Sequence, residues 1–371
     1  NVDPRRDHSF RVPRPDLTVS VGSPNACNGC HQAPGEDAAW AAAKVVEWYG
    51  DKRPDDPHWA PAIAAGRDGD PLGEKLLIDL VRRDQAPAIV RATGVELLGQ
   101  YASEAAQREV KTQLESLDPM VRAAAARSVR PPTADRLIGT LVDSLQDPSR
   151  TVRGEVARRL AGAPRNTLTG DQLDALNEAL VDYRHAQSLQ AERAGAHVNL
   201  AEVATRLGDD AGAVSALRTA VRLEPYLTGP RSQLALALSR AGGSPEEIQR
   251  VQREEIENLR RDVEFLPENP PTHYQLGMLL YQVGELAEAE DALLTACRLA
   301  PQTYQFRMAL ALLQERRYEL TGEEQHFRSA VDSLRELEKL NRSDQTAMAI
   351  LQRLLATRRG LKLETSRPVA E

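Results

Sequence analysis

Apolar residues recur through most of this chain at spacings of three and four, in blocks separated by short polar turns. That spacing places the apolar side chains on one face of a helix. The blocks come in pairs, as expected for helices that bury their faces against each other and against the next pair. We therefore predict an all-α chain in which a short N-terminal region precedes an α-solenoid.

A first repeat occupies residues 66–165, which we expect to form HEAT-like helix pairs. Its marker is a triplet ending in Val-Arg that recurs every 31 residues: Ile89-Val90-Arg91, Met120-Val121-Arg122 and Thr151-Val152-Arg153. The last two follow Asp118-Pro119 and Asp147-Pro148, and Asp before Pro favours a helix start. We expect the arginines to donate to carbonyls or to these aspartates within the stack, rather than to bind an anion.

A second repeat, with tetratricopeptide spacing, lies in the third region, residues 166–371. Residues 194–225 and 269–301 carry the same small and apolar residues at matching positions, and His197 matches His273. That equivalence favours packing over metal binding. Between them a repeat starts at residue 234, but its closing proline comes late, which predicts a second helix longer by about two turns. We expect a closing helix at residues 344–359, and His185 and His326 at the surface.

Composition excludes some classes of protein. The chain has 371 residues, a formal charge of −7 and only 4% aromatic residues, and the acidic balance argues against nucleic acid as the principal partner. No run of residues is long and apolar enough to predict a membrane span. Of the three cysteines, Cys297 lies among apolar helical neighbours and is expected to be packed.

The most specific chemical signal lies in the first region, residues 1–65, in the run Cys27-Asn28-Gly29-Cys30-His31. Two thiols at this spacing can each form a thioether with one vinyl group of a haem, and the following histidine can then bind the iron. The same Cys-x-x-Cys spacing serves zinc sites and redox dithiols. A zinc site needs further ligands, and a redox dithiol of the thioredoxin kind needs a βαβ setting, whereas the following sequence is helical in pattern.

Other residues of the first region are candidates around such a haem. Residues 1–35 contain several prolines and show no helical period, so we expect an extended arm that folds around the cofactor. His8 is the first candidate for a second axial ligand and His58 the next. All three tryptophans, Trp40, Trp48 and Trp59, follow closely. Core packing is their ordinary role, and Trp40 is our candidate for a ring against the haem.

The run from Asp7 to Pro15, the motif from Asn25 to His31 and the order of the two repeats together resemble the C-terminal portion of bacterial multihaem c-type cytochromes fused to tetratricopeptide repeats. The resemblance implies that Cys27 and Cys30 anchor haem c, that His31 is the proximal iron ligand and that His8 is axial. It also implies export to the periplasm or the cell exterior, with Asn1 a processed or truncated start. Such proteins carry several haem motifs, and this sequence has one.

These observations predict an exported electron-transfer cytochrome whose helical repeats dock other cytochromes or copies of the same chain. Two alternatives stay open: an interaction scaffold in which the haem is only structural, and a haem enzyme or gas sensor with an open iron site.

Overall fold

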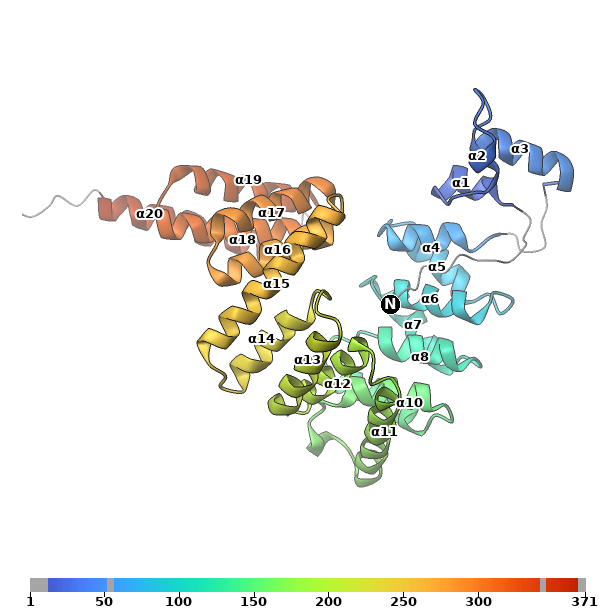
Figure 1. Cartoon of the computed structure of the whole chain (residues 1–371), viewed down its shortest axis with the longest axis horizontal. Coiled ribbons are helices and arrows are strands. Elements are labelled where there is room, and N and C mark those ends of the chain that lie inside the picture. The colour runs from blue at the N-terminus through green and yellow to red at the C-terminus, as the bar shows by residue number, and fades with distance from the viewer. Residues whose placement is uncertain (1–12, 52–56, 341–344, 366–371) are drawn as a thin grey trace, which may run out of the picture. The chain divides into compact units, whose positions relative to one another are not determined.

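The fold was obtained as a computed structural model that describes residues 13–51, 57–340 and 345–365. Within these ranges there are twenty α-helices, three short 3-10 helices and no strand (Figure 1). The predicted all-α class is therefore confirmed. The chain divides into two compact units, Asn1–Ala186 and Gln187–Glu371, called here the N-terminal unit and the C-terminal unit. The finer boundaries predicted at residues 65 and 165 stay predictions.

The helices of the N-terminal unit are mostly short. They are α1 (Pro15–Val21), α2 (Cys27–Cys30), α3 (Ala38–Tyr49), α4 (Ala60–Arg67), α5 (Gly73–Val81), α6 (Ala88–Leu98), α7 (Glu104–Thr112), α8 (Pro119–Ser128), α9 (Ala134–Leu141), α10 (Arg150–Leu160) and α11 (Gly170–Ser188), with 3-10 helices at Gln113–Glu115, Val142–Gln146 and Arg165–Thr167.

The start of this unit differs from the predicted extended arm. Pro15 begins α1, where its missing N–H costs nothing, and Gly22 ends it with a left-handed φ of 69°. Leu17 is buried, and α1 packs on α3 and α4. The prediction was wrong for residues 15–21 and 27–30, because two helices too short to show a period in the sequence form there. Residues 1–12 lie outside the described ranges.

The second helix of each pair forms the spine of the N-terminal unit: α8 packs on α6 and on α10. Asp118 caps α8 as predicted, since its carboxylate accepts from the Met120 N–H at 2.8 Å with Pro119 at the first position. Asp147 instead accepts from the Ser149 N–H, and α10 starts only at Arg150.

The recurrent arginines bind within the stack, so that prediction is confirmed. Arg122 holds both carboxylate oxygens of Asp147, at 2.7 and 3.0 Å, and donates to the Ser116 carbonyl. Arg153 donates to the Asp147 carbonyl and, at 3.0 Å, to Asp182 on α11. Arg122 and Arg153 thus each join the linker before their own helix to a carboxylate farther along the chain, using the several donors of the planar fork. Arg91 donates to the Val81 carbonyl and to the side-chain oxygen of Gln113, a neutral acceptor.

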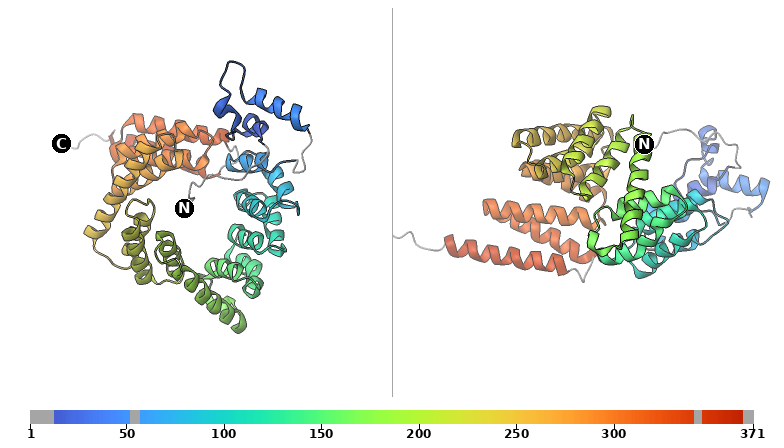
Figure 2. Two further views of the ribbon diagram at one scale, coloured as in Figure 1. Left: turned by 45° about the vertical axis from the view of Figure 1, so that its right-hand side comes forward. Right: turned by 90° about the horizontal axis from the view of Figure 1, so that it is seen from below.

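The C-terminal unit consists of longer helices in consecutive antiparallel pairs. They are α12 (Ala194–Arg206), α13 (Asp210–Leu223), α14 (Pro230–Arg240), α15 (Pro245–Phe265), α16 (Pro270–Val283), α17 (Leu286–Leu299), α18 (Tyr304–Thr321), α19 (Glu324–Leu340) and α20 (Gln345–Thr365). The last three, orange to red in Figure 2, lie side by side.

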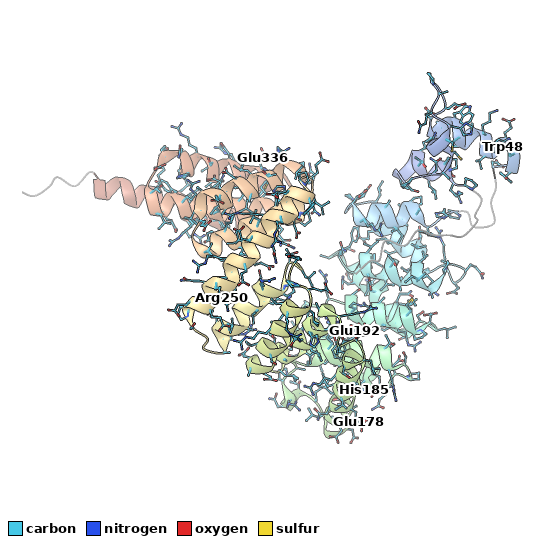
Figure 3. The ribbon with its side chains drawn as sticks, in the orientation of Figure 1. Trp48, Glu178, His185, Glu192, Arg250 and Glu336 are labelled. Carbon is cyan, nitrogen blue, oxygen red and sulfur yellow. The ribbon has the colours of Figure 1, made fainter. Side chains whose placement is uncertain are left out.

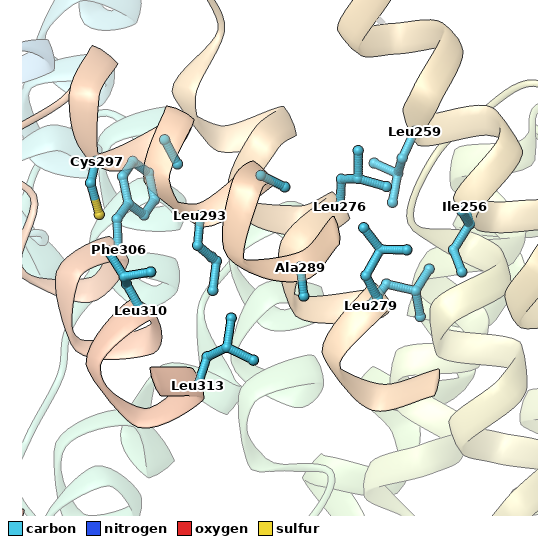
Figure 4. Packing of buried hydrophobic residues seen from close by; sticks show 13 residues of the cluster. Ile256, Leu259, Leu276, Leu279, Ala289, Leu293, Cys297, Phe306, Leu310 and Leu313 are labelled. Atoms are coloured by element: carbon cyan, nitrogen blue, oxygen red, sulfur yellow. The ribbon is translucent and has the colours of Figure 1, made fainter. Parts of the chain in front are cut away.

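Leucines and small residues form the core of the C-terminal unit, as Figure 4 shows for α15 to α18. Leu280 and Leu293 are each 1% exposed, and Cys297 is buried as predicted. Gly277 lies where α16 crosses α17. A Cβ there would lie 2.7 Å from Leu293 Cγ, closer than packed carbon atoms approach, so this crossing requires glycine.

In each repeat of this unit, a side chain in the first helical turn forms a hydrogen bond with a carbonyl of the linker that precedes the helix. His197 and His273 bind the carbonyls of Ala191 and Pro267 through Nε2, at 2.8 and 2.9 Å. Arg231 and Arg307 do the same to Pro225 and Pro301, at 2.8 and 3.3 Å. The structural role predicted for the two histidines is therefore confirmed.

Two further expectations have opposite outcomes. The helix predicted to be long, α15, has 21 residues against 14 in α13 and in α17, an excess of 21 − 14 = 7 residues, or two turns. His185 is exposed as predicted, but His326 is only 4% exposed, so its surface placement was wrong. His326 lies in the first turn of α19, whose apolar face packs on α18.

Across the described parts of the chain, none of the helices combines the length and the apolar character that crossing a membrane requires.

Candidate functional site

The Cys27–Cys30 segment folds as a single helical turn, α2. Gly29 and His31 close the turn by donating their N–H groups to the Ala26 and Cys27 carbonyls, at 3.2 and 2.9 Å. Residues three apart on one turn share a side of the helix, so both thiols project together. Cys27 is half-buried, Cys30 is exposed, and neither is in a disulfide.

Two asparagines fasten this turn to its neighbours. Asn25 donates through Nδ2 to the Thr18 hydroxyl on α1 at 2.8 Å and to the Asn28 side-chain oxygen at 2.9 Å. Asn28 donates through Nδ2 to the Glu36 carbonyl, just before α3, at 2.8 Å. The turn that carries the thiols is thereby held between α1 and α3 by side chains of the motif itself.

His31 stands at the end of the turn with its ring against Trp40. The two ring centroids are 4.9 Å apart and the planes are inclined at 48°. The Glu36 carboxylate lies 3.4 Å from Nδ1 of the imidazole. The same carboxylate accepts a hydrogen bond from the Ala33 N–H. A carboxylate beside one ring nitrogen fixes a histidine in the orientation in which its other nitrogen faces a ligand.

Of the two histidines predicted as further ligands, the structure describes only His58. His8 lies outside the described residues. His58 precedes α4, where its Nδ1 accepts the Ala60 N–H at 3.0 Å and its ring lies 4.5 Å from that of Trp59. Trp48 on α3 is 65% exposed (Figure 3), so the core packing expected of the tryptophans is wrong there.

Metal ligands do not cluster further. In residues 13–51, 57–340 and 345–365, no three His, Cys, Asp or Glu side chains group so as to hold a metal ion. A closed zinc site takes four such ligands, so the described residues do not complete one. Two accessible thiols on one turn with an adjoining imidazole match the donor set of a covalent haem, which needs only these three protein atoms on its attachment side.

The C-terminal unit carries a second candidate site, a groove of about 720 Å³. One wall comes from α14, with Gln233 and Leu236, and the other from α16, with Gln275 and Met278; α15 lines the groove between them. Leu236 is 57% exposed although leucine favours burial. A hollow of about 370 Å³ shares Met278 and continues along α16 and α18.

Sequence analysis did not identify this groove. Its glutamines and serines give no local signal, because such residues are ordinary on any solvated helix face. A usable signal was the unexplained length of α15, which marks this repeat as different from its neighbours. The leucine at position 236 is a weaker one.

Comparison with known proteins agrees with the repeat assignment. The profile of the tetratricopeptide repeat family matches residues 270–303, which contain α16 and α17. No curated protein matches the sequence. Residues 270–303 therefore match a tetratricopeptide repeat, and the described residues around them form further pairs of helices.

Several solved structures match the chain, each at a TM-score below 0.5. A thermophilic TPR protein in Thermus thermophilus is 23% identical, with a TM-score of 0.37 over 55% of this chain and 99% of that chain. MamA from Desulfovibrio magneticus is 15% identical, with a TM-score of 0.34, and the match covers 52% of this chain and 98% of MamA. Yeast Tom70 is 13% identical, with a TM-score of 0.39, and the match covers 94% of this chain and 81% of Tom70. The predicted resemblance to multihaem cytochromes stays a prediction.

Proposed function

We propose that this chain is a protein-interaction scaffold that binds a partner protein through the groove between α14 and α16. The observation that carries the proposal is the groove itself, about 720 Å³ between first helices of consecutive repeats, with one wall formed by the stretch that matches a tetratricopeptide repeat. Stacked helix pairs keep such a surface rigid, so a partner that binds there loses little entropy to ordering of the scaffold.

The test is recovery of partner proteins from the native source with a tagged full chain. Leu236→Glu places a charge on the exposed wall of the groove and should abolish recovery without unfolding the repeat, because Leu236 is already 57% exposed. Leu294→Glu is the matched control. Leu294 is 46% exposed on α17, outside the groove, and its replacement should leave recovery unchanged. Loss of the partner with Leu294→Glu alone would move the binding face to the second helices.

A second function is favoured by the geometry of α2. We propose that Cys27 and Cys30 anchor one haem c with His31 as its proximal ligand, and that Trp40 lies against it. Two accessible, unbridged thiols on one turn and the adjoining His31 support this. A bound haem would supply one-electron transfer, and the scaffold would bring other cytochromes or copies of the chain near it. In that case the chain is exported, to the periplasm or beyond.

Intact mass of the denatured protein tests this second function. Protein matured where covalent haem attachment occurs should exceed the polypeptide mass by one haem, and the double variant Cys27→Ser, Cys30→Ser should not. The spectra of His8→Ala and His58→Ala then test the sixth ligand, with a shift toward high spin expected for His8→Ala. A bare polypeptide mass in the wild type would refute the haem and leave the scaffold proposal intact.

A further inference from the structure

Glu255 is a buried carboxylate in the groove, and one of its two oxygens has no hydrogen-bond partner within the described residues. It lies on α15, is 1% exposed and lines the groove between α14 and α16. Its Oε1 accepts the backbone N–H of Gly229, the residue that caps α14. Its Oε2 is buried and has no hydrogen-bond partner within the described residues.

An unpaired carboxylate oxygen in such a place is costly for the folded protein. Burying a charged group without a partner costs several kcal/mol, and the group then tends to take up a proton. Burial indeed raises the pKa of Glu255, although the Gly229 N–H and the positive charge of Arg231 act against the rise. Arg231 itself is committed elsewhere, to Glu254 and to the Pro225 carbonyl.

The surroundings of Glu255 contain no competing charge inside the groove. The other lining side chains are apolar or neutral, and they include the amides of Gln233, Gln252, Gln275 and Gln282. Glutamine amides can both donate and accept, as the backbone of an extended peptide requires. A groove that binds a peptide backbone in this way would distinguish partners mainly through the one charged side chain that it contains.

We propose that the groove binds an extended segment of a partner protein and that Glu255 selects a lysine in that segment. This inference rests on the proposed scaffold function and names the partner's chemistry. Oε1 of Glu255 already accepts the Gly229 N–H, which leaves Oε2 as the oxygen without a partner. This arrangement favours a lysine ammonium, which binds one oxygen as a point charge, over an arginine fork, which binds most strongly when both oxygens accept its parallel bonds. The apolar stem of the lysine would pack along Leu236 and Ile248, with its remaining donors toward Gln252.

The experiment uses the full chain and a library of capped peptides of about eight residues, the length that spans such a groove when extended. One central position is lysine, arginine, glutamine or glutamate in otherwise matched sequences. Binding is measured by fluorescence anisotropy for wild type, Glu255→Gln and the control Glu246→Gln. Glu246 is exposed in the first turn of the same helix and does not line the groove.

Wild type and Glu246→Gln should bind the lysine peptides about tenfold more tightly than the glutamine peptides. Glu255→Gln keeps the shape and the acceptor for Gly229, so it should bind both sets equally and weakly while its helical melt persists. Equal residue preferences in wild type and Glu255→Gln would overturn the role of Glu255. Failure of every peptide to bind would overturn the peptide-binding groove, whereas the scaffold proposal fails only if Leu236→Glu still recovers the partner.

Discussion

The two units of this chain anchor the linkers between their helix pairs with the same local bond but connect successive pairs differently. In both, a side chain in the first turn of a helix binds a carbonyl six residues earlier, as with Arg122 and Ser116 or His273 and Pro267. In the N-terminal unit the same guanidinium also reaches a carboxylate of the next repeat, Asp147. The imidazole of His273 has no equivalent second bond to give, and leucine packing joins its repeat to the next.

The difference shows how short and long helices solve the same problem. Helices of 8 to 11 residues, such as α8, α9 and α10, bury few leucines per repeat, so a directional, charge-assisted bond adds cohesion. Helices of 14 residues, such as α16 and α17, bury more apolar surface in each repeat. Their charge-assisted bonds to the next repeat, such as the one from Arg317 to Glu290, come from positions outside the first turn. Loss of one side chain should therefore have different consequences in the two units.

Arg122→Ala should have the largest effect. It leaves the Asp147 carboxylate, 9% exposed in its side chain, without its cation, and we expect a loss of about 3 kcal/mol in the N-terminal unit. Hydrogen exchange of amides in α8 and α10 measures it as an opening free energy. Arg127→Ala is the control on the same helix, because Arg127 is 43% exposed and its ion pairs are longer; it should cost less than about 1 kcal/mol. Equal losses would contradict the contrast between the units.

Replacing a helical glycine by leucine should destabilise the C-terminal unit but stabilise the N-terminal unit. Gly277→Leu should destabilise α16 and α17 by about 2 kcal/mol, because any Cβ collides with Leu293. Gly139→Leu in α9 meets nothing within 4 Å, so the better helix propensity should stabilise by up to about 1 kcal/mol. Thermal unfolding followed by circular dichroism, together with exchange in each helix, checks both. A stable Gly277→Leu would mean that the crossing of α16 and α17 is looser than described.

The equivalent histidines offer a smaller effect within one unit. His273 is 8% exposed, so His273→Leu should remove a bond to the Pro267 carbonyl that is formed by a buried side chain, and should cost about 1 kcal/mol. His197 is more exposed, and water can replace its bond to the Ala191 carbonyl, so His197→Leu should cost only a few tenths of that. Urea unfolding of the two variants compares them. Equal costs would show that the burial of the histidine side chain does not set the cost of losing its bond.

A change of pH should shift the stability of the two units in opposite directions, and this should be the smallest of the expected effects. Burial alone would raise the pKa of Asp147, but hydrogen bonds from Arg122 and the Ser149 N–H, with the charges of Arg122 and Arg153, hold that pKa below its usual value. Its stabilising contribution is present above the unfolded pKa of about 3.9 and is lost as pH falls through the native value. Burial raises the pKa of Glu255, so the native state binds a proton there more readily than the unfolded state does, and stability falls as pH rises from the unfolded pKa through the native one.

Hydrogen exchange of amides at several pH values, corrected for the intrinsic exchange rate, measures the contributions of Asp147 and Glu255 to the stability of their own units. Asp147→Asn should remove its share of the acid sensitivity of α10, and Glu255→Gln its share of the alkaline sensitivity of α15. An unchanged pH dependence in either variant would show that other carboxyl groups dominate.

The parts of the fold that sequence predicted are those fixed by periodicity. Arg91, Arg122 and Arg153 recur at a constant spacing, and the equivalence of His197 and His273 survives the longer helix between them. The parts it missed depend on contacts between distant residues. The short helix α1 is stabilised by packing on α3 and α4, and the burial of His326 depends on the approach of α18.

The candidate sites divide in the same way. The motif Cys27-Asn28-Gly29-Cys30-His31 is contiguous and could be recognised from its chemistry, although its haem stays a prediction. Glu255 could not be recognised, because a glutamate in the charged stretch of α15 has the pattern of a solvated residue. Only the fold shows that one of its oxygens is buried without a partner.

The extra seven residues of α15 have a consequence for how such chains change in length. Seven residues are two turns to within about 20° of rotation, so an insertion of this size leaves the buried stripe facing the same neighbours. An insertion of two or five residues would turn that stripe toward solvent. Growth by whole turns therefore extends the end of a helix beyond its repeat without a new core, and in α15 that end displays Phe265, 82% exposed, as surface on which new contacts can arise.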